Sequence, residues 1–138
     1  MASHFTLTFT AGPEHIDVLG HVNNAVWVQW MEAVAVAHWQ SDARPQDVAA
    51  YVWVVTRHEI DYRGNIGAGE SVEARTFIPD GPKAARFDRR VDFYRAGGDR
   101  PIVSARTTWA MIDVATGRLC RIPADVAAAF GPFGGSGD

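Results

Sequence analysis

The sequence has little cysteine, and this limits the chemistry that the chain can support. Cys120 is the only cysteine in 138 residues. One thiol cannot form a disulfide within the chain, and it cannot build a cysteine-based zinc site. The single cysteine fits a reducing compartment.

Lysine and excess positive charge are also scarce. Lys83 is the only lysine, the other twelve basic residues are arginines, and the formal net charge is −3. Proteins that bind nucleic acid usually concentrate cations against the phosphates. Nucleic acid is therefore not an expected partner.

Long apolar runs are missing as well. No segment approaches the roughly 20 apolar residues that a membrane-spanning helix needs. Residues 1–10 lack the cationic start and the apolar run of a signal peptide. We therefore expect no membrane association and a cytoplasmic location.

What remains is the composition of one globular domain. Hydrophobic residues make up 47% and charged residues 21%, close to the globular average, which excludes a disordered, collagen-like or coiled-coil chain. The length suits a single domain, which we place at residues 1–130. Residues 131–138 are rich in glycine and are expected to form a flexible tail.

Periodicity predicts five strands and one long helix. The strands are expected at residues 4–10, 51–62, 71–78, 86–95 and 102–114, of which the last is the longest. The helix is expected from about residue 25 to residue 40, with 41–47 as a connecting loop and 123–130 as a short terminal helix.

This order of elements predicts an α+β fold. The four strands after the helix are expected to be joined by hairpins, and consecutive strands with short turns favour an antiparallel sheet. A helix that is apolar on most sides needs protein around it. A curled five-stranded sheet wrapped around one long central helix satisfies both. Such a sheet keeps open edges, and pairing two edges across a symmetry axis would cover them, so we expect a homodimer.

The most informative segment is Asp-Val-Leu-Gly-His-Val-Asn-Asn at residues 17–24, directly before the helix. A helix N-terminus offers unpaired N–H groups that can polarise a carbonyl and hold an oxyanion. The Asp17 carboxylate could attack that carbonyl or activate water. The same residue types are also ordinary loop and cap residues, so spacing alone leaves a structural role open.

This segment resembles the Asp-x-x-Gly-His-Val-Asn-Asn signature of hotdog-fold acyl-CoA thioesterases, the 4-hydroxybenzoyl-CoA thioesterase-like group. The similarity continues in order along nearly the whole chain. It includes Trp27, Glu32, residues 58–63, 69–72 and 105–109, Asp113, and residues 116–118 and 121–123.

The resemblance implies the hotdog fold, a homodimer or homotetramer with its site at the subunit interface, and hydrolysis of an acyl-CoA to a free acid and CoA. It implies Asp17 as nucleophile or general base, backbone N–H groups near Asn24 that polarise the thioester carbonyl, and His21 as a support. No metal and no other cofactor is implied. The residues expected to bind substrate are Gly20, Asn23, Trp27, His58 and Arg89, the last as a cation for the phosphates of CoA.

Several alternatives stay open. Leu19 stands where related acyl-carrier-protein thioesterases have asparagine, yet such a thioesterase remains an alternative. Glu32 lies where other hotdog branches place their carboxylate, and its position about two turns into the helix favours a supporting or salt-bridge role over a catalytic one. A dehydratase would need an Asp-x-Asn-x-x-His spacing that is absent here. A non-catalytic module that binds acyl-CoA is the remaining alternative.

Overall fold

The computed structural model describes residues 3–133, and its elements follow the sequence pattern closely. The strands are β1 (His4–Thr10), β2 (Tyr51–Tyr62), β3 (Ser71–Phe77), β4 (Arg86–Arg95), β5 (Val103–Asp113) and β6 (Arg118–Leu119). The helices are α1 (Asn24–Asp42), α2 (Pro45–Ala50) and α3 (Ala124–Ala127), with single 3-10 turns η1 (Pro13–His15) and η2 (Ala128–Phe130).

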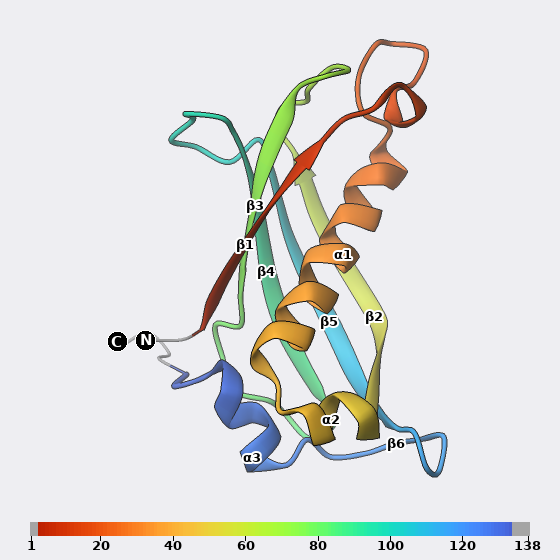
Figure 1. Ribbon diagram of the computed structural model, residues 1–138, viewed down its shortest axis with the longest axis vertical. Coiled ribbons are helices and arrows are strands. Elements are labelled where there is room, and N and C mark those ends of the chain that lie inside the picture. Colours follow the sequence, from red (N-terminus) through yellow and green to blue (C-terminus); the bar gives the residue numbers. More distant parts are fainter. Residues whose placement is uncertain (1–2, 134–138) are drawn as a thin grey trace.

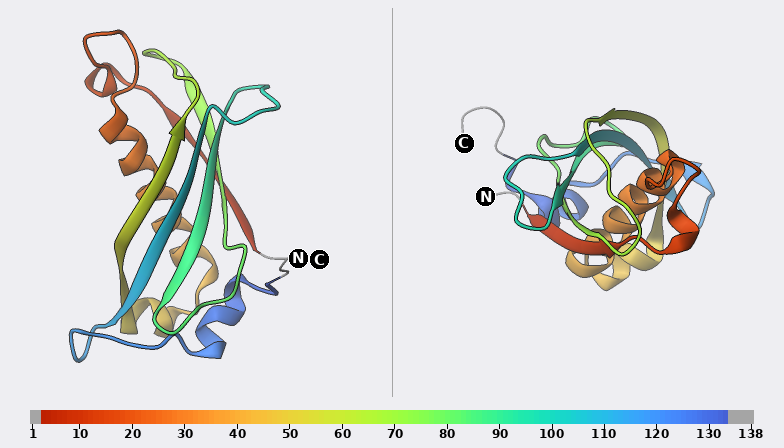
Figure 2. Two further views of the ribbon diagram at one scale, coloured as in Figure 1. Left: turned by 180° about the vertical axis from the view of Figure 1, so that it is seen from behind. Right: turned by 90° about the horizontal axis from the view of Figure 1, so that it is seen from above.

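The strands form one antiparallel sheet that curls around α1. Its order is β1-β3-β4-β5-β2, and the two-residue β6 pairs with β5. The helix lies along the concave face, whereas no helix within residues 3–133 covers the opposite face (Figures 1 and 2). The predicted hotdog arrangement, a curled sheet around one central helix, is thereby confirmed.

Two details of the predicted topology are wrong. Among the five predicted strands, consecutive ones pair as hairpins for β3–β4 and β4–β5 but not for β2–β3, because β2 pairs with β5 and β3 pairs with β1. The longest strand is β2 with 12 residues, against 11 for β5. Alternation along a strand shows which face is buried, but it does not specify which strand lies alongside.

The connection after α1 also differs from the prediction. The loop expected at residues 41–47 is mostly helical, because α1 continues to Asp42 and α2 begins at Pro45. Proline is well tolerated in the first turn of a helix, where its missing N–H has no partner to lose. Pro45 therefore starts a helix here.

The core lies between α1 and the concave face of the sheet. One cluster surrounds Trp27 and Phe93, and a second surrounds Trp39 and Met111. Within this single chain α1 keeps one exposed face, which carries Gln29, Glu32, Ala33, Val36 and Gln40.

The end of the chain packs near the second cluster. Phe130 is buried and Phe133 packs against the same cluster. Residues 134–138, most of the predicted tail, lie outside the described residues. Within residues 3–133, no helix has both the length and the apolar character needed to cross a membrane.

Candidate functional site

A tight loop precedes α1 and carries most of the predicted site. Ile16 and Val22 form an isolated antiparallel bridge that closes it. The Asp17 N–H donates to the His21 carbonyl at 2.9 Å, and the Gly20 N–H donates to the Asp17 carbonyl at 3.1 Å. Gly20 has a φ of 79°, a left-handed conformation that other residues avoid, so glycine suits the turn.

The Asp17 carboxylate is oriented by its own loop. Its Oδ1 accepts hydrogen bonds from the N–H groups of Leu19 at 2.9 Å and His21 at 3.3 Å. Among residues 3–133, Oδ2 has no hydrogen-bond partner. One oxygen therefore fixes the side chain, and the other can accept a proton or attack a substrate.

The start of α1 supplies a possible oxyanion site beside this loop. Asn23 caps the helix, and its Oδ1 accepts the Ala25 N–H at 2.9 Å. Asn24 is the first helical residue, and its N–H makes no hydrogen bond within the described part of the chain. A free N–H at the positive end of a helix is the donor that a developing oxyanion needs.

The loop and the helix start share one end of the molecule. The Asn23 N–H donates to the His15 carbonyl at 2.9 Å, which ties the helix start to the base of the loop. This end is the upper end of α1 in Figure 1. Between residues 3 and 133, the Asp17 carboxylate and the Asn24 N–H make no direct hydrogen bond, and the His21 side chain is exposed without one.

A second polar group links α1 to the sheet near this end. His58 Nδ1 lies 2.8 Å from Thr107 Oγ1, and His58 Nε2 lies 3.5 Å from Glu32 Oε2. The Tyr62 hydroxyl donates to the Asn24 carbonyl at 3.4 Å. Glu32 thus lies within ion-pair distance of His58 on β2, a pairing that the sequence pattern did not identify.

Two of the predicted substrate-binding residues lie in the interior. Trp27 is fully buried and packs edge-to-face on Trp30 and Phe93. Arg89 is only 3% exposed, and its Nη1 donates to His38 Nδ1 at 2.8 Å and to Thr76 Oγ1 at 3.0 Å. The Arg89 guanidinium therefore lies in the interior and is held by two buried side chains.

The sequence pattern did not identify the partners of Arg89. His38 is fully buried, and its Nε2 lies 2.8 Å from Ser3 Oγ and 3.2 Å from Asp42 Oδ2. The Ser3 hydroxyl donates to the same Asp42 oxygen. Since His38 Nδ1 accepts from Arg89, the ring is neutral with its proton on Nε2.

Burial shifts the pKa values of His38, Arg89 and Asp42. It lowers the pKa of His38 to about 4, with the Arg89 charge adding to the effect. It also lowers the pKa of Arg89 to about 10, so the guanidinium stays charged at neutral pH. Burial raises the pKa of Asp42, but the hydrogen bonds from Ser3, Ser41 and His38 lower it by more than burial raises it. The pKa of Asp42 is therefore below its usual value.

Comparison with known proteins assigns this chain to a family. The sequence profile of the thioesterase-like superfamily matches residues 11–130, which include the loop, α1 and the whole sheet from β2 onward. A search of curated proteins gave no match.

Solved structures of low sequence identity share the fold. A 1,4-dihydroxy-2-naphthoyl-CoA thioesterase from Synechocystis is 17% identical, with a TM-score of 0.77 over 93% of this chain and 96% of that one. A protein from Staphylococcus aureus in complex with CoA is also 17% identical, with a TM-score of 0.79 over 94% and 82%. A predicted thioesterase from Bacillus stearothermophilus is 22% identical, with a TM-score of 0.79 over 93% and 94%.

Proposed function

The chain belongs to the thioesterase-like superfamily and is a thioester hydrolase, and from this premise we propose that it hydrolyses an acyl-CoA to the free acid and CoA. The observation that carries the proposal is the loop at residues 16–23. It presents a carboxylate with one free oxygen at the same end of the molecule as an unpaired helix N–H.

In the proposed reaction the Asp17 carboxylate promotes attack on the carbonyl carbon of the thioester, by one of two routes. As a general base, its Oδ2 takes a proton from water while the water oxygen bonds to the thioester carbon. As a nucleophile, Oδ2 bonds to that carbon directly, and water then cleaves the resulting anhydride. In both routes the C–S bond breaks, and the CoA thiolate leaves and takes up a proton.

The N–H of Asn24 is proposed to bind the thioester oxygen. Negative charge develops on that oxygen as the carbon becomes tetrahedral, and the helix dipole adds to the stabilisation. His21 is proposed to line the same site, because its exposed side chain lies in the loop that holds Asp17. Gly20 and Asn23 are proposed to shape the substrate-binding surface through the turn and the cap.

The proposal predicts that Asp17→Asn abolishes most of the activity. The amide keeps the size of the side chain but cannot take a proton, so thiol release from a good acyl-CoA should fall by roughly 100-fold or more. The matched control is Asp99→Asn, which removes a carboxylate from an exposed loop of the sheet. Near-normal turnover of the Asp17→Asn protein would show that this carboxylate is not catalytic.

An acyl-carrier-protein thioesterase is the main alternative within the same chemistry. One assay separates the two, because matched acyl groups can be offered on CoA and on a carrier protein while thiol release is followed. The proposal expects the higher kcat/KM with CoA. Binding of acyl-CoA without any thiol release, across short, long and aryl acyl groups, would favour the non-catalytic alternative.

We further propose a homodimer joined along the β2 edge, with the site beside the joint. β2 lies at one end of the sheet order and has 12 residues, with Val52, Val54 and Tyr62 exposed. The other edge strand, β1, exposes threonines and His4. The Tyr62 contact with Asn24 places the end of β2 next to the start of α1, so a partner strand on β2 would lie near the proposed oxyanion site.

A further inference from the structure

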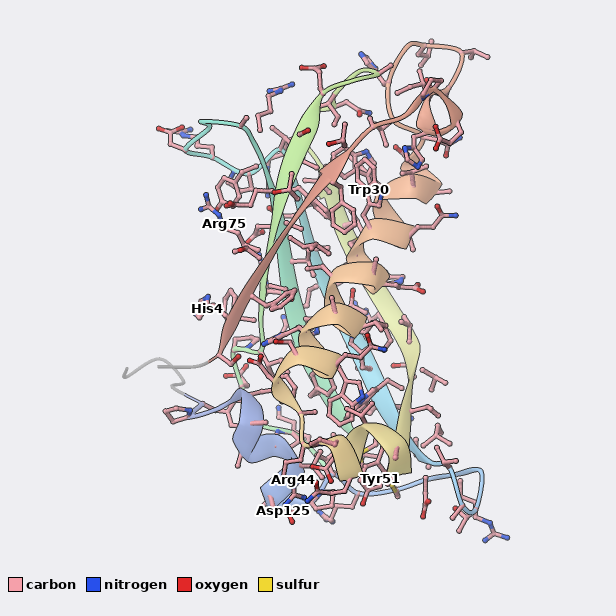
Figure 3. The ribbon with its side chains drawn as sticks, viewed as in Figure 1. His4, Trp30, Arg44, Tyr51, Arg75 and Asp125 are labelled. Carbon is pink, nitrogen blue, oxygen red and sulfur yellow. The ribbon has the colours of Figure 1, made fainter. Side chains whose placement is uncertain are left out.

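A second candidate site is a cavity at the other end of α1. It has a volume of about 300 Å³ and is lined by residues of α1, α2, β2, β4, β5 and α3. Tyr51, one of its lining residues, lies at the lower end of Figure 3 beside Arg44 and Asp125, whereas the loop at residues 16–23 lies at the upper end. A cavity of about 150 Å³ already holds benzene, so this one has room for a small organic ligand.

The walls of the cavity are aromatic. Trp39 and Trp53 meet edge-to-face at 5.2 Å, and Trp53 meets Phe87 in the same way at 5.0 Å. The aromatic lining residues are Trp39, Tyr51, Trp53, Phe87, Trp109, Phe130 and Phe133. Val36 and Val52 also line the cavity and are 45% and 49% exposed within this single chain, so it opens between α1 and the edge strand β2, on the side where the proposed dimer would place the partner.

Two buried donors in this wall have no partner. Arg89 and Trp109 both line the cavity and are 3% and 6% exposed, and neither Arg89 Nε nor Trp109 Nε1 makes a hydrogen bond within residues 3–133. Buried N–H groups are nearly always paired, because an unpaired one loses its bond to water. Within residues 3–133, the Arg89 Nε–H and the Trp109 Nε1–H therefore lack an acceptor.

The two donors are neighbours on one face of the sheet. Arg89 pairs with Thr107 across β4 and β5, and Phe87 pairs with Trp109. Trp109 is thus diagonal to Arg89, a spacing of about 7 to 8 Å that long side chains can bridge. One small acceptor group can therefore be reached by both.

The positive charge of Arg89 also lacks a directly paired carboxylate among the described residues. Among the described residues that line the cavity, none is an aspartate or a glutamate. Within the described residues Arg89 has no direct ion pair, and it reaches Asp42 only through the neutral ring of His38. A buried cation is usually paired directly with an anion, because burial alone is costly.

We propose that the cavity binds a hydrophobic carboxylic acid in its anionic form. The apolar part of the ligand lies among the aromatic rings, and its carboxylate accepts hydrogen bonds from Arg89 Nε and Trp109 Nε1. The proposal concerns binding at a second site and does not depend on the proposed hydrolysis, although the product of that hydrolysis belongs to the same chemical class.

Ligand pairs that differ only in the head group test this on the wild-type protein. Octanoate is compared with octan-1-ol, and 4-phenylbutyrate with 4-phenylbutan-1-ol, by titration calorimetry and by tryptophan fluorescence, since Trp39, Trp53 and Trp109 line the cavity. We expect each acid to bind at least about tenfold more tightly than its alcohol, as a charge-assisted hydrogen bond provides. Equal binding of acid and alcohol, or no saturable binding of either acid, would overturn the proposal.

Two conservative variants assign the donors. Trp109→Phe keeps a ring but removes the N–H, and it should weaken acid binding severalfold while leaving alcohol binding unchanged. Trp53→Phe is the matched control, because it changes an indole of the same cavity whose N–H is not among the unpaired donors. In NMR spectra the Trp109 indole N–H signal, assigned by its loss in Trp109→Phe, should shift with the acid and not with the alcohol. An acid that binds Trp109→Phe and wild type equally, without shifting that signal, would contradict the assignment.

Discussion

At the scale of single residues, His38 connects a buried cation to a partly exposed carboxylate without carrying a charge. Its Nδ1 accepts from Arg89 and its Nε2 lies against Ser3 and Asp42. A protonated ring would place a second positive charge 2.8 Å from the guanidinium. The neutral ring is therefore part of what allows Arg89 to be buried.

This arrangement makes stability depend on pH. Because the pKa of His38 is about 4 in the folded protein and near 6.5 when unfolded, the unfolded chain takes up a proton first as the pH falls. The contribution of neutral His38 to the free energy of unfolding is fully present above about pH 6.5 and is lost as the pH falls towards 4. By about pH 5 the loss should be roughly 2 kcal/mol.

The measurement is chemical denaturation of wild type and His38→Gln at about pH 7.5 and pH 5. Glutamine can accept from Arg89 and donate to Asp42, but it does not titrate in this range. The loss attributed to His38 is the difference between the two proteins, which removes the contribution of carboxylates. Parallel pH dependence in both proteins would show that His38 is not responsible.

The sequence predicts the local structure of the loop at residues 16–23 better than it predicts the partners of interior side chains. Turn and cap chemistry predict this local structure because the residues involved lie close together in sequence, at Asp17, Gly20, Asn23 and Asn24. Arg89 is different, because its partner His38 lies 51 residues away and on another element. Arg89 shares the buried face of its strand with Val91 and Phe93, but no local pattern can reveal which buried groups satisfy its hydrogen bonds.

At the scale of elements, the start of α1 has a structural role besides the proposed catalytic one. The Asn23 side chain satisfies the Ala25 N–H, whereas the side chain of Asn24 makes no hydrogen bond within residues 3–133. Replacing a cap residue by alanine costs about 1 kcal/mol. The two neighbouring asparagines can therefore be separated by experiment.

We expect Asn23→Ala to lower the free energy of unfolding by about 1 kcal/mol. Asn24→Ala, an exposed change at the next position, should alter it much less and serves as the control. Urea denaturation followed by circular dichroism measures both. Equal destabilisation by the two changes would mean that the cap bond of Asn23 is not what stabilises this end.

The limits of sequence prediction at this scale have clear physical causes. The strands at 4–10, 51–62 and 86–95 are confirmed to the residue, because each alternates between a buried and an exposed face. The helix α2 was missed because Pro45 indicates a break unless it stands in a first turn. The partner of β2 was mistaken because pairing depends on the whole sheet and not on the strand.

At the scale of the whole molecule, the β2 edge determines how copies would assemble. An unpaired edge of this length with exposed valines favours pairing with another strand. In the proposed dimer the two β2 strands would run antiparallel across a twofold axis. The exposed face of α1 would then also lie near the partner.

We expect a particle of twice the chain mass in sedimentation equilibrium, with the outward-facing amides of β2 protected from hydrogen exchange. Thioesterase activity should fall on dilution below the dissociation constant of the dimer, because the site lies beside the joint. The amides of β1, the other edge, provide the internal control and should exchange faster. A fully active monomer at every concentration would contradict this assembly.

The contact of Ser3 with His38 and Asp42 has a practical consequence for work with this protein. The Ser3 hydroxyl completes the group of polar side chains, with His38 and Asp42, that surrounds the charged Arg89. Shortening the chain by a few residues, or changing position 3 while adding a purification tag, would thus disturb the interior as a core substitution does. Tags are better fused so that Ser3 keeps its place and its side chain.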